Sequence, residues 1–447
     1  KIENDSIVND EQEHEYLTQL YKEIHNPQMT TFLCNSWKAW VNLGKNRDPD
    51  CFHPDFHISV IHSNDNMKQV KEQYLNETIP PLIPQNFPLR QRPSNLKNKQ
   101  IFTQRPSNNV MGQMGYYCTD RYTPIVSPLR RELCVDAEIV LRACFELLTQ
   151  YQYTDSKKAK ANLDEDTETN KTTCSGGISR NYIEKTIYQK KGCVYALTTH
   201  PGHHAGYTSF GGYCYLNNAA LAAQCLLHPC SINMKNNITL ETANKSRTVA
   251  ILDVDYHCGN GTADIFYHRD DVMVVSIHCD PDIEYPFHSG HKDQIDPPTT
   301  LHIPLAPGTS WEKCSATKSP ISVSCESHDD SSAGPQRNCY GTDRIKPLSY
   351  KDALYLALDS IVQVMMKTSL SALVVSLGLD THHLDPVAVP GAGFTLVDDD
   401  YRKMGNMIGN WSRQNSVPVI FIQEGGYIID KVGDIVLNVL NGFILDE

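Results

Sequence analysis

Short apolar runs rich in β-branched residues alternate with segments of helical length through the second half of this chain. Such runs are typical of strands buried on both faces of a parallel sheet. The expected strands are Val194–Thr198, Thr248–Val254, Val272–Ile277, Ala372–Leu377 and Val417–Ile422. The expected helices are Leu133–Tyr151, Asn217–Leu227, Tyr350–Lys367, Tyr401–Asn415 and Lys431–Phe443. This alternation predicts an α/β fold with a doubly wound, mostly parallel sheet flanked by helices.

Three long polar stretches interrupt the alternation, near residues 156–188, 229–247 and 313–346. Each contains too few apolar residues to pack against a core. We therefore expect surface loops inserted into a single domain that spans residues 1–447. Their length also makes them candidate docking surfaces for protein partners.

Charge, hydropathy and cysteine usage exclude several classes of protein. The net charge of −12 argues against direct nucleic-acid binding over the whole chain, and no apolar run is long enough to span a membrane. Fifteen cysteines, an odd number without regular spacing, indicate reduced thiols rather than a disulfide framework. We expect a nuclear or cytoplasmic protein that is not secreted.

Polar side chains follow four of the predicted strands at the point where each strand ends. His203 and His204 follow the first strand, and a DVDYH sequence ends the second. Asp380 follows the fourth, and Tyr427 follows the last. Because ligands of open α/β sheets bind beyond the carboxyl ends of the strands, these clusters predict one site at that edge.

The second of these clusters points to a metal. Asp253, Asp255 and His257 alternate along an extended segment and therefore share one face. Burying two carboxylates and an imidazole is costly unless a cation or other partners neutralise them. Two oxygen ligands, one nitrogen ligand and an open position are typical of a catalytic zinc site, although a single Asp or His could instead be a cap or a core residue.

The His203–His204 and Tyr427 clusters are open to more than one interpretation. The adjacent His203 and His204 suit proton transfer near neutral pH, but metal ligation or simple hydrogen bonding would use the same residues. Two glycines before Tyr427 permit a backbone that presents the phenol inward, where its hydroxyl could donate to an oxyanion. By itself a Gly-Gly-Tyr sequence is a weak signal.

Taken together, several motifs resemble those of the zinc-dependent histone deacetylase superfamily. They are HPGHHA, FGGYCYLNNAALAAQ, ILDVDYHCGNGTADIFY, SLGLDT and EGGY. GQMGYYC at 112–118 and HCDPDIEYPF at 278–287 are most similar to the acetylpolyamine amidohydrolase-like branch. The resemblance extends from roughly residue 16 to residue 443 and implies a single arginase/deacetylase-like domain.

The resemblance assigns roles residue by residue. It implies one catalytic zinc ion bound by Asp255, His257 and Asp380. The implied catalytic residues are His203 as general base paired with Asp253, His204 paired with Asn260 to protonate the leaving amine, and Tyr427 to polarise the carbonyl. The implied substrate-binding residues are Gly212, through its carbonyl, and the aromatic tunnel walls Tyr213 and Tyr285.

The resemblance also implies potassium ions. One would bind at Asp253, Asp255, His257, Ser276 and Ile277. A second would bind at backbone oxygens of Phe266, Arg269 and Val272. One position departs from the family pattern, because Cys258 stands where many relatives have a second His, and we expect a small buried thiol outside the catalytic zinc site.

The implied reaction is hydrolysis of an N-acetyl amide with release of acetate. We expect acetyl-lysine of histone tails or other proteins as the substrate, which would imply chromatin regulation. Recognition of an acetylated polyamine needs carboxylates, whereas Met111 and Tyr122 are uncharged where that branch has acids, and Asp120 is the only acid nearby. The main alternative is an acetylpolyamine amidohydrolase.

Two further alternatives belong to other classes. A binuclear-metal ureohydrolase has a similar fold but needs more liganding carboxylates than this chain presents. A catalytically inactive binder of acetylated ligands is disfavoured because every expected catalytic position is filled.

Overall fold

The computed structural model describes residues 10–44, 82, 108–126, 129–164, 193–228, 247–314, 348–365, 369–388 and 391–445. A six-stranded sheet lies at its centre, with strand order β1-β6-β5-β2-β3-β4 and parallel pairing throughout. The strands are β1 (Cys193–Ala196), β2 (Arg247–Asp253), β3 (Val272–Cys279), β4 (Thr300–Leu305), β5 (Ser369–Leu377) and β6 (Val419–Gln423). The predicted doubly wound parallel α/β fold is confirmed.

The five predicted strands are present with ends shifted by a few residues, whereas β4 was not predicted. Its sequence, TLHIPL, contains a histidine and a proline, and only some of its side chains are buried. Pro304 has no backbone N–H to donate, so this sequence suits a strand at an edge of a sheet. β4 indeed pairs only with β3 in the sheet order.

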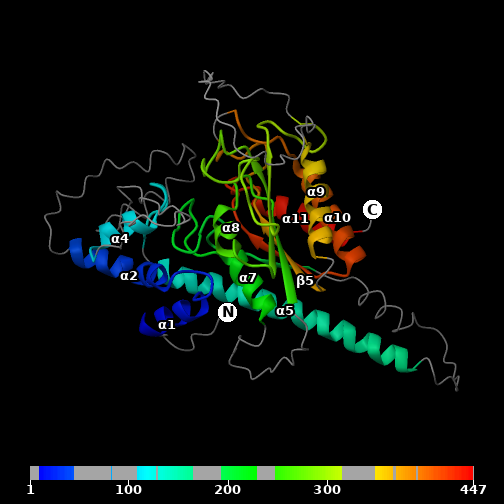
Figure 1. Cartoon of the computed structure of the whole chain (residues 1–447), viewed down its shortest axis with the longest axis horizontal. Helices are drawn as coiled ribbons and strands as arrows, with labels where there is room; N and C mark the ends of the chain where they lie inside the picture. Colours follow the sequence, from blue (N-terminus) through cyan, green and yellow to red (C-terminus); the bar gives the residue numbers. More distant parts are fainter. Residues whose placement is uncertain are drawn as a thin grey trace, which may run out of the picture.

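Helices cover both faces of the sheet (Figure 1). The helices are α1 (Asp10–Leu20), α2 (Pro27–Gly44), α4 (Val110–Tyr117), α5 (Leu129–Asp164), α7 (Asn218–Leu227), α8 (Asn260–Phe266), α9 (Tyr350–Met365), α10 (Asp398–Asn415) and α11 (Val432–Ile444). α9, α10 and α11 cover one face, and α5 and α7 cover the other (Figure 1). Because strand side chains alternate between faces, the core is divided into two layers. Val249 and Ile251 of β2 pack with α7, whereas Ala250 and Leu252 pack with α9 and α10.

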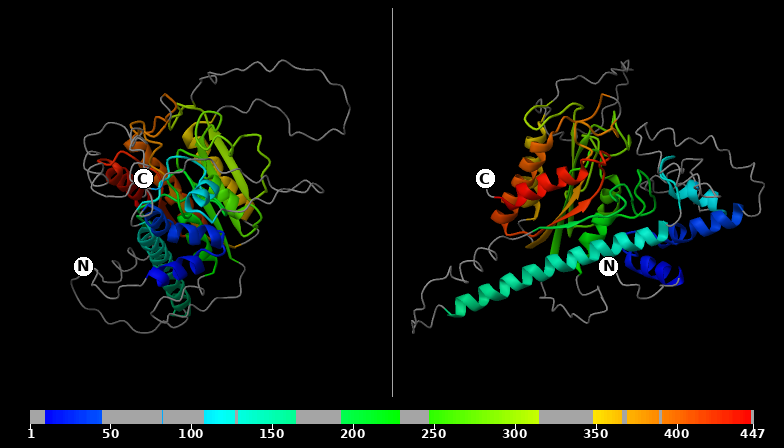
Figure 2. Two further views of the ribbon diagram at one scale, coloured as in Figure 1. Left: turned by 90° about the vertical axis from the view of Figure 1, so that its left-hand side faces the viewer. Right: turned by 180° about the vertical axis from the view of Figure 1, so that it is seen from behind.

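Helix α5 is much longer than the predicted helix 133–151 and extends past the sheet (Figure 2). It continues through Asp164, so the first nine residues of the predicted 156–188 loop are helical instead. Residues 156–164 (SKKAKANLD) include three Lys, two Ala and one Leu, which are good helix formers, and this explains how a segment with few apolar residues can continue a helix. Almost all of the remaining predicted insertions lie outside the described residues.

Two further observations concern membrane-spanning helices and disulfide bonds. No helix in the described part of the chain has the length and apolar character needed to cross a bilayer. The cysteines within the described ranges are all free thiols.

Candidate active site

The four strand ends that carry polar clusters are neighbours in the sheet. The order β1-β6-β5-β2 places the carboxyl ends of these four parallel strands side by side at one edge. The sequence order of the clusters did not reveal this adjacency, because β6 inserts between β1 and β5. The expected convergence of the clusters is therefore explained by the topology.

Asp255, His257 and Asp380 form a buried group of three ligands. Their ligand atoms all lie within 4.8 Å of one another. His257 Nδ1 lies 3.2 Å from Asp255 Oδ1 and 3.1 Å from Asp380 Oδ2. Two carboxylate oxygens and an imidazole nitrogen at this spacing can hold one divalent ion and leave a position open.

The electrostatics of this group favour a cation. Burial, followed by the neighbouring charge of Asp255, raises the pKa of Asp380 to about 7. Burial opposes ionisation of His257, but its hydrogen bonds to the two carboxylates raise its pKa to about 10. Two buried carboxylates repel each other, and a divalent ion between them would remove that cost.

His203 is held by Asp253. Its Nδ1 lies 2.9 Å from Asp253 Oδ2, and its Nε2 faces Asp255 Oδ1 at 3.5 Å. Burial lowers the pKa of His203, but the charges of Asp255 and Asp253 outweigh burial and raise it well above its ordinary value. His203 can accept a proton near neutral pH only if the charge of Asp255 is offset, which a divalent cation at Asp255 would do.

His204 lies beside His203 in a different environment. Its Nδ1–H donates to Asn260 Oδ1 over 2.7 Å, which leaves Nε2 as the acceptor. Burial and the charges of His203 and His257 hold the pKa of His204 well below its ordinary value. The two adjacent imidazoles therefore differ in proton affinity, as a base and a second proton carrier must.

Tyr427 follows two glycines that lie against the metal-ligand group. A Cβ on Gly425 would lie 2.7 Å from Asp380 Oδ2 and 2.8 Å from Asp255 Oδ2, so only glycine fits there. Gly426 has φ +143°, a backbone conformation that favours glycine. Burial and the charges of Asp380 and Asp255 raise the pKa of Tyr427 well above its ordinary value, so its hydroxyl keeps its proton and can donate.

The predicted substrate-binding residues lie next to the two histidines. Gly212 and Tyr213 both have left-handed backbones, with φ +58° and +63°. The Tyr213 ring lies 6.0 Å from that of Tyr427, and the Tyr285 ring packs edge-on against His204 at 4.7 Å. A Cβ on Gly212 would lie 2.3 Å from the His204 ring, which is why a glycine stands there.

Asp120 is the only acid in the stretch where a polyamine would be recognised, but its carboxylate is not free to bind an ammonium group. Its Oδ1 accepts the backbone N–H groups of Tyr122 and Thr123, and its Oδ2 accepts the Thr123 hydroxyl and the Gly212 N–H. The side chain is buried. Asp120 therefore holds the Gly212 turn in place and has no acceptor left for an ammonium group.

The predicted ligands of the first potassium ion adjoin one another next to the metal-ligand group. Ser276 is paired in register with Asp253, and its hydroxyl accepts the Gly259 N–H, so Ser276, Ile277 and the 253–257 segment adjoin. For the second ion, the Phe266 carbonyl accepts the Arg269 N–H, and Val272 begins β3. Both potassium sites remain predictions.

Three carboxylates hold the backbone of the site loops in place, although the sequence analysis gave them no role. Glu424 accepts the N–H groups of Gly202 and His203, at 2.6 and 3.1 Å. Asp136 accepts the N–H groups of Thr199 and His200. Asp385 Oδ2 accepts the Tyr427 N–H at 2.7 Å. Glu424 stands within the EGGY motif and could have been singled out, whereas Asp136 and Asp385 carry no local signal.

Comparisons with known proteins show which family this chain resembles. A histone deacetylase domain model matches residues 50–443. Acetylpolyamine amidohydrolase 1 of Pseudomonas aeruginosa is 30% identical over 338 residues, which is 75% of this chain and 68% of that protein. Acetylpolyamine amidohydrolase 2 of the same organism is 26% identical over 426 residues, 94% of this chain and 81% of that protein.

A solved structure, an acetylpolyamine aminohydrolase from Burkholderia pseudomallei, shares the fold. Its TM-score is 0.50 at 22% sequence identity, and the match covers 93% of this chain and 90% of that one. The family model, the two relatives and the parallel α/β fold agree. The chain belongs to the histone deacetylase family of hydrolases, among its acetylpolyamine amidohydrolase-like members.

Proposed function

We propose that this chain is a zinc-dependent hydrolase that removes the acetyl group from N-acetylated polyamines and releases acetate. The observation that carries the proposal is the juxtaposition of the buried Asp255, His257 and Asp380 group with two oriented histidines. Metal-assisted amide hydrolysis uses both a cation to polarise the carbonyl and groups to move protons, and this edge of the sheet has residues suited to each task.

The ligand group suits zinc. It offers two carboxylate oxygens and one imidazole nitrogen, the donor types of a three-ligand catalytic zinc site. When bound there, zinc supplies Lewis-acid polarisation of the amide carbonyl and acidifies the attacking water. Within the described ranges, Asp255 and Asp380 are the two carboxylates of this ligand group, which favours one metal over a binuclear ureohydrolase centre.

The protein groups then complete the reaction. His203 takes a proton from the attacking water, and Asp253 stabilises the imidazolium that forms. Tyr427 donates its hydroxyl proton in a hydrogen bond to the developing oxyanion. His204, oriented by Asn260, assists proton delivery to the leaving nitrogen, so that acetate and an amine are the products.

The substrate class rests on the relatives rather than on a charged residue of the site. The two curated relatives described above are both acetylpolyamine amidohydrolases, which supports a polyamine substrate over the acetyl-lysine that we expected from the sequence. The net charge of −12 attracts a polycation at long range. The recognising carboxylate is not Asp120, because its oxygens already accept hydrogen bonds.

Acetyl-lysine in proteins stays the second candidate. It is favoured by the uncharged Met111 and Tyr122 and by the engagement of Asp120, which leave that stretch without a free carboxylate. We also propose potassium binding at the two predicted sites, and a nuclear or cytoplasmic location.

The test is a side-by-side measurement of acetate release. N-acetylputrescine, N-acetylspermidine and acetyl-lysine histone peptides would be supplied to the full chain, with Asp255→Asn as a blank for contaminating deacetylases. We expect a kcat/KM for the polyamines at least about 10-fold above that for the peptides, a difference of about 1.4 kcal/mol. A preference for the peptides would favour the second candidate, and no acetate from any substrate would contradict the hydrolase proposal.

A further inference from the structure

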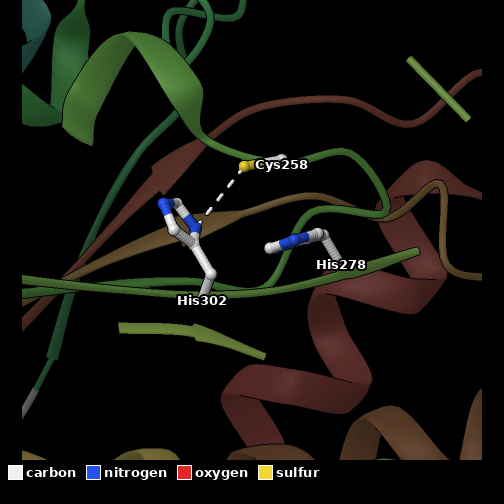
Figure 3. A group of neighbouring side chains, drawn as sticks. All are labelled: Cys258, His278 and His302. Atoms are coloured by element: carbon white, nitrogen blue, oxygen red, sulfur yellow. Dashed lines mark hydrogen bonds between the residues drawn. The ribbon is translucent and has the colours of Figure 1, made fainter. Parts of the chain in front are cut away.

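A second group of metal-ligating side chains lies beside the catalytic group and shares no residue with it. Cys258, His278 and His302 place one sulfur and two ring nitrogens within 4.8 Å of one another. Figure 3 shows the three side chains converging from the loop after β2, from β3 and from β4. None of the three has a part in the reaction proposed above.

The sheet register brings the two histidines together. Ser276 on β3 pairs with His302 on β4, and His278 lies two residues further along β3. Because strand side chains alternate, Ser276, His278 and His302 share one face, and the imidazole rings lie 5.5 Å apart. The loop that carries Cys258 crosses this face, so three separate segments supply one ligand each.

The distance between two of the three ligand atoms matches a tetrahedral metal centre. Cys258 Sγ lies 3.6 Å from His302 Nδ1. Two ligands at zinc–sulfur and zinc–nitrogen bond lengths, separated by the tetrahedral angle, lie about 3.6 Å apart. One thiolate and two imidazoles are donors preferred by zinc and similar borderline ions.

Each histidine also has an oxygen placed to orient it. His302 presents Nδ1 to the sulfur, and its Nε2 faces Asp296 Oδ2 at 3.6 Å. That Nε2 is buried, makes no hydrogen bond and belongs to a side chain that is 2% exposed. Ligating histidines commonly turn their second nitrogen to a carboxylate, so an ion on Nδ1 would give this imidazole a defined tautomer.

His278 needs a change of tautomer, and a small movement relative to the Gly290 carbonyl, to become a ligand. Its Nε2–H donates to the Gly290 carbonyl over 3.0 Å, and its Nδ1 lies 2.9 Å from the Ser276 hydroxyl. If Nδ1 takes the proton and donates to Ser276, Nε2 is freed toward the sulfur. A neutral imidazole is kept in both arrangements.

Gly290 keeps the space between these two ligands open. A Cβ there would lie 2.6 Å from both Cys258 Sγ and His278 Nε2. The position has φ +92°, which also favours glycine. Asp296, which faces His302, and Ser289, which precedes Gly290, line a neighbouring cavity of about 600 Å³.

We propose that Cys258, His278 and His302 bind a second, zinc-class divalent ion. The ion would join the loop after β2 to strands β3 and β4, and would therefore fix the loop on which His257 lies. The proposal is independent of the catalytic assignment, because the two groups share no ligand.

Cobalt substitution tests this directly, because Cys258 supplies a sulfur ligand and the catalytic group of Asp255, His257 and Asp380 contains none. The full chain would be stripped of metal and loaded with Co²⁺, and the bound cobalt and the near-ultraviolet thiolate-to-cobalt absorption would be measured. We expect two ions per chain and the thiolate band. Asp255→Asn should lose one ion and keep the band.

Cys258→Ser should lose one ion and the band, whereas Cys225→Ser, a matched change at another buried cysteine, should keep both. His302→Gln gives a second variant that leaves the sulfur in place, and it should also lose one ion. Wild-type protein that binds a single ion without the band would overturn the proposal whatever the variants do. A band that persists in folded Cys258→Ser would overturn it as well.

Discussion

At the scale of single residues, the candidate site depends on groups with well-defined protonation. Tyr427 keeps its proton because burial and two carboxylates disfavour the phenolate. His204 stays neutral because burial and two neighbouring imidazoles disfavour its cation. Asp255, together with Asp253, raises the proton affinity of His203. The carboxylate of Asp255 therefore raises the pKa of both Tyr427 and His203, whereas burial and neighbouring imidazoles set that of His204.

Removing the Tyr427 hydroxyl should affect turnover alone. Tyr427→Phe deletes one oxyanion donor and little volume, so we expect kcat to fall by about 10²–10³-fold while bound zinc per chain is unchanged. Steady-state kinetics and metal analysis on the same preparation would check this. Unchanged turnover would remove Tyr427 from the mechanism.

Asp385 should act through Tyr427. Its two oxygens accept the N–H groups of Tyr427 and Val387, and an asparagine has one acceptor oxygen instead of two. A hydrogen bond to a charged group contributes about 1.5–3 kcal/mol, so Asp385→Asn should lower kcat by about 10- to 100-fold.

KM and bound zinc should change little in this variant, because Asp385 belongs to neither ligand group. Adding Asp385→Asn to the Tyr427→Phe variant should lower kcat little further, since the hydroxyl that Asp385 positions is then absent. An equally large loss when Asp385→Asn is added to the Tyr427→Phe variant would contradict a positioning role.

Residues next to strand ends were predictable from the sequence, and residues that act across the fold were not. Asp255, His257 and Asp380 stand directly after apolar runs, where a ligand is expected. Asp120 looked like a free acid because nothing local shows that it accepts the Gly212 N–H. Cys258, His278 and His302 come together only through the pairing of β3 with β4, and β4 itself was not predicted.

At the scale of elements, the turn between α1 and α2 is fixed to the catalytic loops by one histidine. His25 Nδ1 lies 2.8 Å from the Gly206 carbonyl, and its Nε2 accepts the Asn217 N–H at 2.9 Å. This pattern requires a neutral ring. Burial lowers the pKa of His25 from 6.5 to about 4, although the hydrogen bond to Gly206 partly opposes it.

His25 should therefore make stability depend on pH. Between pH 6.5 and 4 the unfolded chain binds a proton at this residue and the folded chain does not, so the free energy of unfolding falls as pH falls. The pKa difference at His25 makes its full contribution to the free energy of unfolding above pH 6.5, and this contribution amounts to about 3 kcal/mol.

His25→Gln supplies the comparison for this prediction. A glutamine amide can donate to Gly206 and accept from Asn217 but does not titrate, so the variant should lose stability less steeply between pH 6.5 and 4. Urea unfolding at several pH values would measure both slopes. Parallel curves for the two proteins would show that His25 does not carry this dependence.

At the scale of the whole molecule, the topology explains why this sheet edge carries the chemistry. The neighbouring strands β1, β6, β5 and β2 place their four terminal clusters side by side, and the helical layers bury the rest of each strand. The α/β class was predictable from the alternation of apolar runs. The strand order was not, because it depends on which helices cross which face.

The central claim is that a divalent ion at Asp255, His257 and Asp380 is required for hydrolysis. The most direct measurement is acetate release from N-acetylputrescine by metal-stripped protein as zinc is added back, for the wild type and Asp255→Ala. We expect stripped wild-type protein to be inactive and to recover with zinc, and Asp255→Ala to stay inactive although soluble and folded. Full activity in the stripped protein, or in Asp255→Ala, would contradict the account.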